Sequence, residues 1–160
     1  MSGAVSFVRP GRPPSANRNV GPRGARAGAE LRALYEVAGG SVLDGHLYGI
    51  VYYFVRGYSP ATDADADNIS KRVWDALTGA AYRDDRMVRL RLAGVVEVGA
   101  AEGGAPALQE LDLSDMSRET AGKLLELLGG EEKHILHVGL GLVQPHMFVF
   151  NLAARGADED

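Results

Sequence analysis

Carboxylates concentrate in one part of this 160-residue chain. Three aspartates stand at alternate positions, a lysine follows them, and an aspartate pair comes after a short helical pattern: Asp63, Asp65, Asp67, Lys71, Asp84 and Asp85. Carboxylates this close repel one another and raise each other's pKa unless a cation lies between them. The pattern therefore predicts a metal site.

The spacing of the acids disfavours the calcium loop of an EF-hand. Asp63, Asp65 and Asp67 match its positions 1, 3 and 5, but position 6 is Asn68 in place of glycine and position 12 is Trp74 in place of glutamate. In an extended loop, alternate residues point the same way, so Asp65 and Asp67 can share one face. A structural Ca²⁺-binding module that uses the three alternate aspartates stays open as an alternative.

A hard divalent cation is the best chemical match to these ligands. Carboxylates without nearby cysteine or histidine suit Mg²⁺, and Mn²⁺ is a possible substitute. Magnesium keeps several waters, which leaves positions for a phosphate oxygen and an attacking water. Lys71, one helical turn past Asp67, can stabilise the charge that builds on a pentacovalent phosphorus. These residue types together indicate phosphodiester hydrolysis.

Apolar periodicity predicts the elements that position these residues. A run rich in β-branched and aromatic residues at 43–56 indicates a buried strand, and a helix at 68–77 follows, capped by Asp67 or its neighbour. Further strands are predicted at 5–9, 88–98, 108–113, 135–143 and 147–152, further helices at 29–37 and 117–128, and a mobile segment at 20–28. The expected fold class is α/β (α+β), a single domain with a mixed β-sheet and two or three helices.

Composition narrows the class of protein. The chain has no cysteine, which excludes disulfides, thiolate zinc sites and cysteine nucleophiles. It shows neither a signal-peptide pattern nor a long apolar run, so we expect a soluble, cytoplasmic protein without a membrane partner. Residues 1–92 carry 13 Arg and Lys against 9 Asp and Glu, whereas residues 93–160 carry 4 against 12. This asymmetry points to a polyanionic partner.

Two motifs resemble the RusA family of Holliday junction resolvases. The stretch from Asp65 to Leu77 reads D-A-D-N-I-S-K-R-V-W-D-A-L and looks like the family signature D-x-D-N-x-x-K-x-x-x-D-x-L, with the Asp84-Asp85 pair placed as in the family. An earlier P-P-S-A-N segment ending at Asn17 resembles the family's P-P-S-x-N loop. The likeness covers residues 5–98, within a RusA-like nuclease core at 1–107. Residues 108–160 form an acidic C-terminal extension, expected as a strand, a helix and two strands packed on the same domain.

The resemblance implies a metal-dependent endodeoxyribonuclease of phage or prophage type that resolves Holliday junctions in DNA recombination and repair. It implies that Asp65, Asp67 and Asp85 bind the catalytic Mg²⁺ and that Lys71 assists at the scissile phosphate. It also implies a homodimer that nicks two opposed strands of a four-way junction. The signature also contains Asp75 and Asp84. We expect these two acids to have supporting roles, such as a salt bridge to Lys71 or Arg72.

Basic and polar residues near the motifs are candidates for contact with branched DNA. They lie in the early loop, on the predicted helix and around the aspartate pair: Arg12, Asn17, Arg18, Arg72, Arg83 and Arg86. Such contacts to phosphates add salt-dependent affinity without reading sequence. An alternative function with the same fold is a branched-DNA-binding protein that does not cleave.

Overall fold

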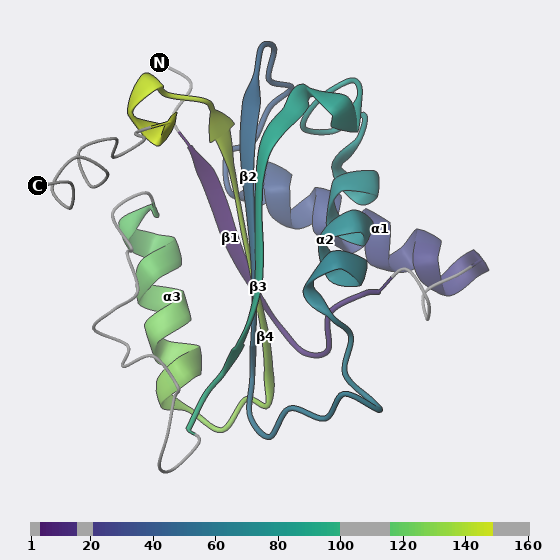
Figure 1. Ribbon diagram of the computed structural model, residues 1–160, viewed down its shortest axis with the longest axis vertical. Helices are drawn as coiled ribbons and strands as arrows, with labels where there is room; N and C mark the ends of the chain where they lie inside the picture. The colour runs from purple at the N-terminus through teal and green to yellow at the C-terminus, as the bar shows by residue number, and fades with distance from the viewer. Residues whose placement is uncertain (1–3, 16–20, 100–115, 149–160) are drawn as a thin grey trace, which may run out of the picture.

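The computed structural model describes residues 4–15, 21–99 and 116–148. One four-stranded mixed sheet and three α-helices form a single α+β domain, as the sequence predicts (Figure 1). In chain order the elements are β1 (Val5–Pro10), α1 (Gly21–Val37), β2 (Leu47–Val55), α2 (Ala66–Leu77), the 3-10 helix η1 (Asp85–Met87), β3 (Val88–Glu97), α3 (Arg118–Gly129), β4 (His134–Leu142) and the 3-10 helix η3 (Pro145–Phe148).

The strands lie in the order β1-β4-β2-β3. β4 is antiparallel to both of its neighbours, whereas β2 and β3 are parallel and are joined through α2. Parallel neighbours need such a crossover, and the helix then covers the sheet beside the two strands. The crossover thus sets where α2, which carries most of the acidic motif, can lie.

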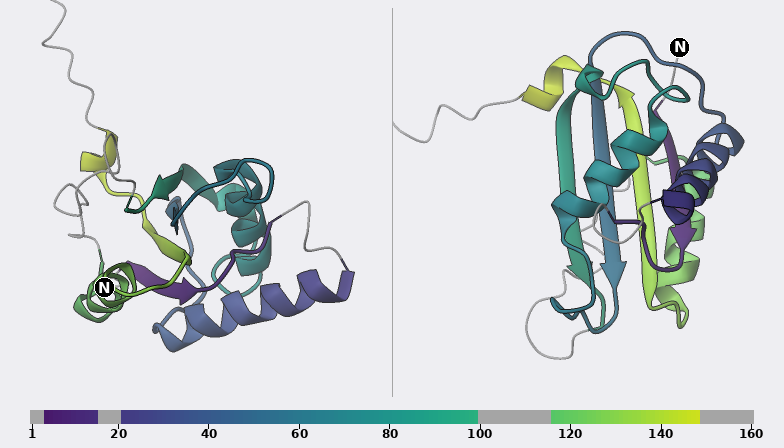
Figure 2. Two further views of the ribbon diagram at one scale, coloured as in Figure 1. Left: turned by 90° about the horizontal axis from the view of Figure 1, so that it is seen from below. Right: turned by 90° about the vertical axis from the view of Figure 1, so that its right-hand side faces the viewer.

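Helices cover both faces of the sheet. α1 and α2 pack side by side on one face and α3 packs on the other (Figures 1 and 2). The larger core cluster lies under α1 and α2 and includes Leu31, Val51 and Trp74, while Phe54 and Leu124 belong to a smaller cluster under α3. No helix in the described part of the chain is long and apolar enough to cross a membrane.

The first helix is longer than expected. Residues 21–28, which we expected to be mobile, are helical, and α1 begins at Gly21 in place of residue 29. The glycines in this segment lower its average helix propensity, so the sequence alone did not indicate a helix there. Pro22 stands in the first turn, where the missing N–H costs nothing, and the alanines and arginines that follow are strong helix formers.

The C-terminal part contributes the strand between β1 and β2. β4 is almost wholly buried, so this segment completes the sheet and the core. The strand expected at 147–152 is not present over its described residues, because residues 145–148 form η3. Pro145 has no N–H to donate to a ladder, which ends the extended run. The rest of that strand, and the strand expected at 108–113, lie outside the described residues.

Candidate functional site

Close packing between α2 and β2 fixes the helix that carries the acidic motif. The Trp74 ring lies directly over Gly49 of β2, and a Cβ on that glycine would collide with the indole. Trp74 and its helix neighbours Ile69, Val73 and Leu77 are fully buried. This packing fixes α2 against the sheet beside β2, with its polar side outward.

Asp65 caps α2. Its backbone is extended, one carboxylate oxygen accepts from the Asn68 N–H at 2.8 Å, and the other accepts from the Asn68 side-chain amide at 3.1 Å. The cap is thus Asp65, two positions before Asp67, and not Asp67 itself. A carboxylate oxygen has two lone-pair directions, so each oxygen of Asp65 retains one for a further partner.

Asp67 and Lys71 stand one turn apart on the exposed side of α2. Neither forms an ion pair among the residues that the structure describes. The carboxylate lies in the first turn, where the helix dipole favours negative charge. Asp75 is exposed one turn beyond Lys71, and the salt bridge that we expected from it to Lys71 or Arg72 is not formed among the described residues.

Asp63 has a different environment from the other two acids of the run. Its side chain is 0% exposed and lies 3.3 Å from the Arg12 guanidinium, while it accepts from the Ser59 N–H at 2.9 Å. Burial raises the pKa of Asp63, but the Ser59 donor and the Arg12 charge outweigh it, so the pKa lies below its ordinary value. Arg12 also donates to the Thr62 carbonyl at 2.7 Å. Asp63 therefore ties the early loop to the acidic loop, and a calcium loop built on it would have to break these contacts.

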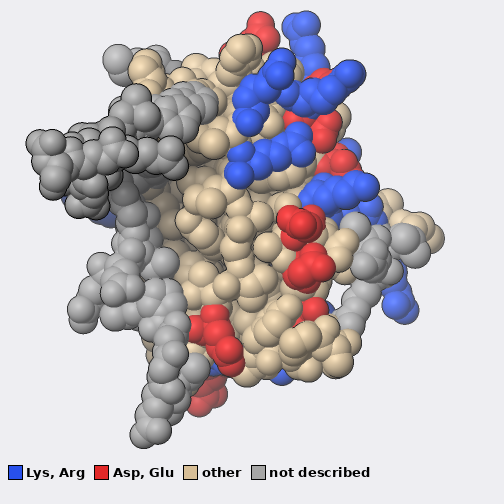
Figure 3. All heavy atoms as spheres, in the orientation of Figure 1, with Lys and Arg blue, Asp and Glu red and all other residues tan. Residues whose placement is uncertain are grey.

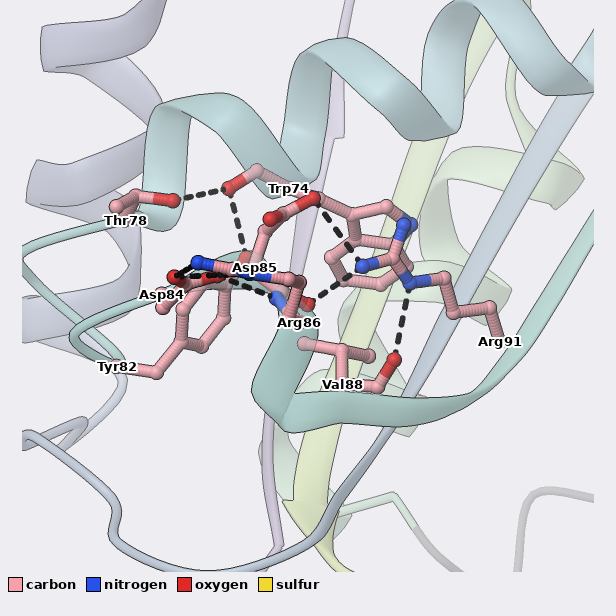
Figure 4. Close-up of polar contacts among 8 residues, drawn as sticks. All are labelled: Trp74, Thr78, Tyr82, Asp84, Asp85, Arg86, Val88 and Arg91. Carbon is pink, nitrogen blue, oxygen red and sulfur yellow. Dashed lines mark hydrogen bonds and ion pairs between the residues drawn. The ribbon is translucent and has the colours of Figure 1, made fainter.

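Asp84 caps η1 and pairs with Arg86, two positions further along the chain (Figure 4). It accepts from the Arg86 N–H at 2.9 Å and forms an ion pair with the Arg86 guanidinium at 2.8 Å. The side-chain hydrogen bond from Arg86, with the backbone one, lowers the pKa of Asp84 to about 2. Asp84 is therefore ionised at neutral pH and partly neutralises an arginine that we expected to contact DNA.

Asp85 is held by an arginine of β3. Its carboxylate lies 3.2 Å from the Arg91 guanidinium, and the same guanidinium nitrogen donates to the Asp85 carbonyl. The Arg91 Nε donates to the Val88 carbonyl at 3.0 Å. Figure 4 shows the three residues joined in this way beside Trp74. The predicted metal ligand thus faces a cation supplied by the chain itself.

The structure places the predicted acids in two groups along α2. Asp65 and Asp67 lie at its N-terminal end, whereas Asp85 lies near Trp74 (Figure 4). Trp74 lies seven positions after Asp67, which is about 10 Å along the helix axis. Within residues 4–15, 21–99 and 116–148, no group of three or more such side chains is arranged to hold a metal ion. The chemistry of the donors nevertheless fits Mg²⁺, because all three are carboxylates with some exposure and hard oxygen ligands are what this ion prefers.

Charged side chains gather on the side of the molecule formed by α2 and the segment that leads into β3 (Figure 3). The exposed cations there are Lys71, Arg83, Arg86, Arg89 and Arg91. Arg72 is partly buried and lies in a groove between α1 and α2, opposite Arg32. Arg12 is 45% exposed despite its pairing with Asp63. Asn17 and Arg18 lie outside the described residues.

Two contacts in the site were not predicted from the sequence. One is the Asp63–Arg12 pair, which joins residues 51 positions apart, and the other is the Asp85–Arg91 pair, which depends on the path of the chain from η1 into β3. Neither contact leaves a periodic pattern in the sequence. The early prolines, which fix the path of the Arg12 loop, were the available hint for the first. Comparison with known proteins adds nothing to these findings, since no family model matches the chain and no curated protein matches it.

Proposed function

We propose that this protein is a Mg²⁺-dependent endonuclease that cleaves branched DNA, with four-way junctions as its main substrate. The observation that carries the proposal is the exposed pair Asp67 and Lys71, next to the Asp65 cap. A carboxylate and an ammonium that are both without an ion-pair partner in the described structure are free to hold a cation and a phosphate. The resemblance to the RusA signature adds the order of the acids and the DNA substrate.

Each residue has a role in this proposal. Asp65, Asp67 and Asp85 would hold Mg²⁺, or Mn²⁺ in its place, which requires the Asp85 carboxylate to move from its position near Trp74 toward the N-terminal end of α2. The bound ion would supply an activated water and stabilise charge on the phosphate oxygens. Lys71 donates to a non-bridging phosphate oxygen as negative charge builds there.

The arginines around the site bind the flanking phosphates in this proposal. Arg83, Arg86 and Arg72 lie on or just after α2, and Arg12 lies on the early loop. Their contacts would be to the DNA backbone, so binding should weaken steeply as salt rises, with each neutralised phosphate adding to the slope. Shape, and not base sequence, would then select the junction.

A cleavage assay on three substrates tests the proposal. Labelled four-way junction, flap and linear duplex are incubated with Mg²⁺ and with the parent, Asp67→Asn or Asp44→Asn. We expect the parent to cut the junction and Asp67→Asn to lose about 100-fold or more of that activity, because a ligand carboxylate is gone. Asp44 is an exposed aspartate in the loop before β2, so Asp44→Asn should cut like the parent.

The other outcomes assign the function differently. Equal cutting by Asp67→Asn and the parent would remove Asp67 from the mechanism. Tight junction binding without cutting by any variant would replace the proposal with the non-cleaving alternative. Tight Ca²⁺ binding without any affinity for DNA would point to the calcium module.

A further inference from the structure

Arg91 holds η1 through three contacts that all end near Asp85. Its guanidinium reaches both the carboxylate and the carbonyl of Asp85, and its Nε bonds the Val88 carbonyl (Figure 4). Two of the three partners are backbone oxygens. Only the contact to the carboxylate uses a group that a metal ion would also need.

The sheet places Arg91 on the same face as α2. Arg91 stands opposite Gly49 in the parallel β2–β3 pair, and Gly49 faces Trp74 of α2. Opposite residues on neighbouring strands point to the same face, so the Arg91 side chain extends from the face of the sheet that α2 covers. From there its guanidinium lies between the sheet and the exposed side of the molecule.

The ion pair is open to solvent and therefore exchangeable. The side chains of Arg91 and Asp85 are 40% and 39% exposed. Exposed pairs of this kind contribute little and are easily replaced by another partner. A divalent ion at the same carboxylate oxygen would repel a guanidinium 3.2 Å away. The two cations cannot both occupy this position.

We infer that Arg91 and the divalent cation compete for the Asp85 carboxylate, and that the guanidinium displaced by the cation becomes a contact for the DNA phosphate. This inference rests on the proposed function. A planar guanidinium matches two phosphate oxygens as well as it matches a carboxylate. Cation binding therefore frees a phosphate ligand, which couples the binding of the cation to the binding of DNA. Arg91 is a positioning residue in the absence of cation and a substrate contact in its presence.

Two binding measurements, made apart from cleavage, test the exchange. Mn²⁺ affinity is measured without DNA by electron paramagnetic resonance, and junction affinity is measured by fluorescence anisotropy in Ca²⁺, for the parent and for Arg91→Gln, Arg91→Lys and Arg118→Gln. We expect Arg91→Gln to bind Mn²⁺ about 1.5- to 5-fold more tightly, because the competitor is removed. The same variant should bind the junction more weakly, and Arg91→Lys should recover part of that loss.

Opposite changes in Mn²⁺ affinity and junction affinity distinguish the exchange from a merely structural role of Arg91. If Arg91 only supports η1, Arg91→Gln should weaken both affinities together. Arg118 is an exposed residue at the start of α3, on the opposite face of the sheet from α2, so Arg118→Gln serves as the matched control and should leave both affinities unchanged. In an Asp85→Asn background, Arg91→Gln should no longer change the Mn²⁺ affinity. Thermal melts of each variant show whether it is folded.

Failure of the inference can be told from failure of the proposed function. Equal Mn²⁺ affinity in the parent and Arg91→Gln would overturn the exchange and leave the nuclease proposal intact. Absence of Mn²⁺ binding in the parent would overturn both. An increase in Mn²⁺ affinity with no loss of junction binding would overturn the second half, in which the freed guanidinium contacts phosphate.

Discussion

Three aspartates at alternate positions have three different environments. Asp63 is buried against Arg12, Asp65 caps α2, and Asp67 is exposed in the first helical turn. The difference follows from the path of the backbone, which turns from a loop into a helix within the run. Alternation therefore predicts a shared face only while the chain stays extended. Residue type alone assigns the same role to all three, and the environment assigns different ones.

The buried pair gives a pH-dependent prediction for Asp63→Asn. The lowered pKa of Asp63 means that its carboxylate contributes stability above the unfolded-state value near 3.8, and that this contribution is lost as the pH falls through the lower folded-state value. We expect Asp63→Asn to lose about 1–3 kcal/mol of unfolding free energy at pH 7, because Arg12 and the Ser59 N–H keep only a neutral acceptor.

Urea denaturation at pH 7, 5 and 3 measures this effect. The difference between the parent and Asp63→Asn should persist at pH 5 and shrink at pH 3, because pH 3 lies below the unfolded-state value of 3.8 and the unfolded parent then binds the proton. Asp44→Asn, at an exposed position, should unfold like the parent at each pH. A difference that stays constant from pH 7 to pH 3 would show that the Asp63 charge does not matter for stability.

At the scale of the elements, the contact between α2 and β2 depends on one glycine. A methyl group at Gly49 has no room beneath the Trp74 ring, so Gly49→Ala should cost about 1–3 kcal/mol through overpacking. The cost should be smaller in a Trp74→Phe background, since a smaller ring leaves space.

Gly122 of α3 faces open space where a methyl group would lie, so Gly122→Ala should instead stabilise the protein by about 0.5–1 kcal/mol. Chemical denaturation measures the change in unfolding free energy for the Gly49 and Gly122 variants, which should be a decrease and an increase respectively. Equal changes at the two glycines would contradict the packing argument.

Local patterns predicted most of the elements but not their neighbours. Apolar runs and spacing identified β2, α2, β3, α3 and β4 to within a few residues, because burial on one face leaves a period in the sequence. The position of β4 between β1 and β2 has no such signal. It depends on pairing between residues more than 80 positions apart, such as Tyr52 with His137. For the same reason the sequence identified the acids of the candidate site but not the arginines that pair with Asp63 and Asp85.

At the scale of the whole molecule, the described residues of one chain contain one candidate site. The acids and the exposed cations lie on the same side, that of α2 and the segment before β3 (Figure 3). A four-way junction is resolved only when two strands of like polarity are cut at symmetric positions. Two sites related by a two-fold axis match that symmetry, and two-fold dimers are the commonest oligomers of soluble proteins. We therefore expect the active species to be a homodimer.

A cruciform plasmid distinguishes a dimer that cuts twice from a monomer that cuts once. Paired nicks within one encounter linearise the plasmid, whereas a single nick relaxes it to an open circle and removes the junction. We expect linear product from the parent and sedimentation as a dimer at micromolar concentration. Mixing the parent with excess Asp67→Asn should form mixed dimers with one working site, which shifts the product toward open circles. A monomer in the centrifuge that still gives linear product would contradict the dimer, and an inactive parent would instead bear on the cleavage proposal itself.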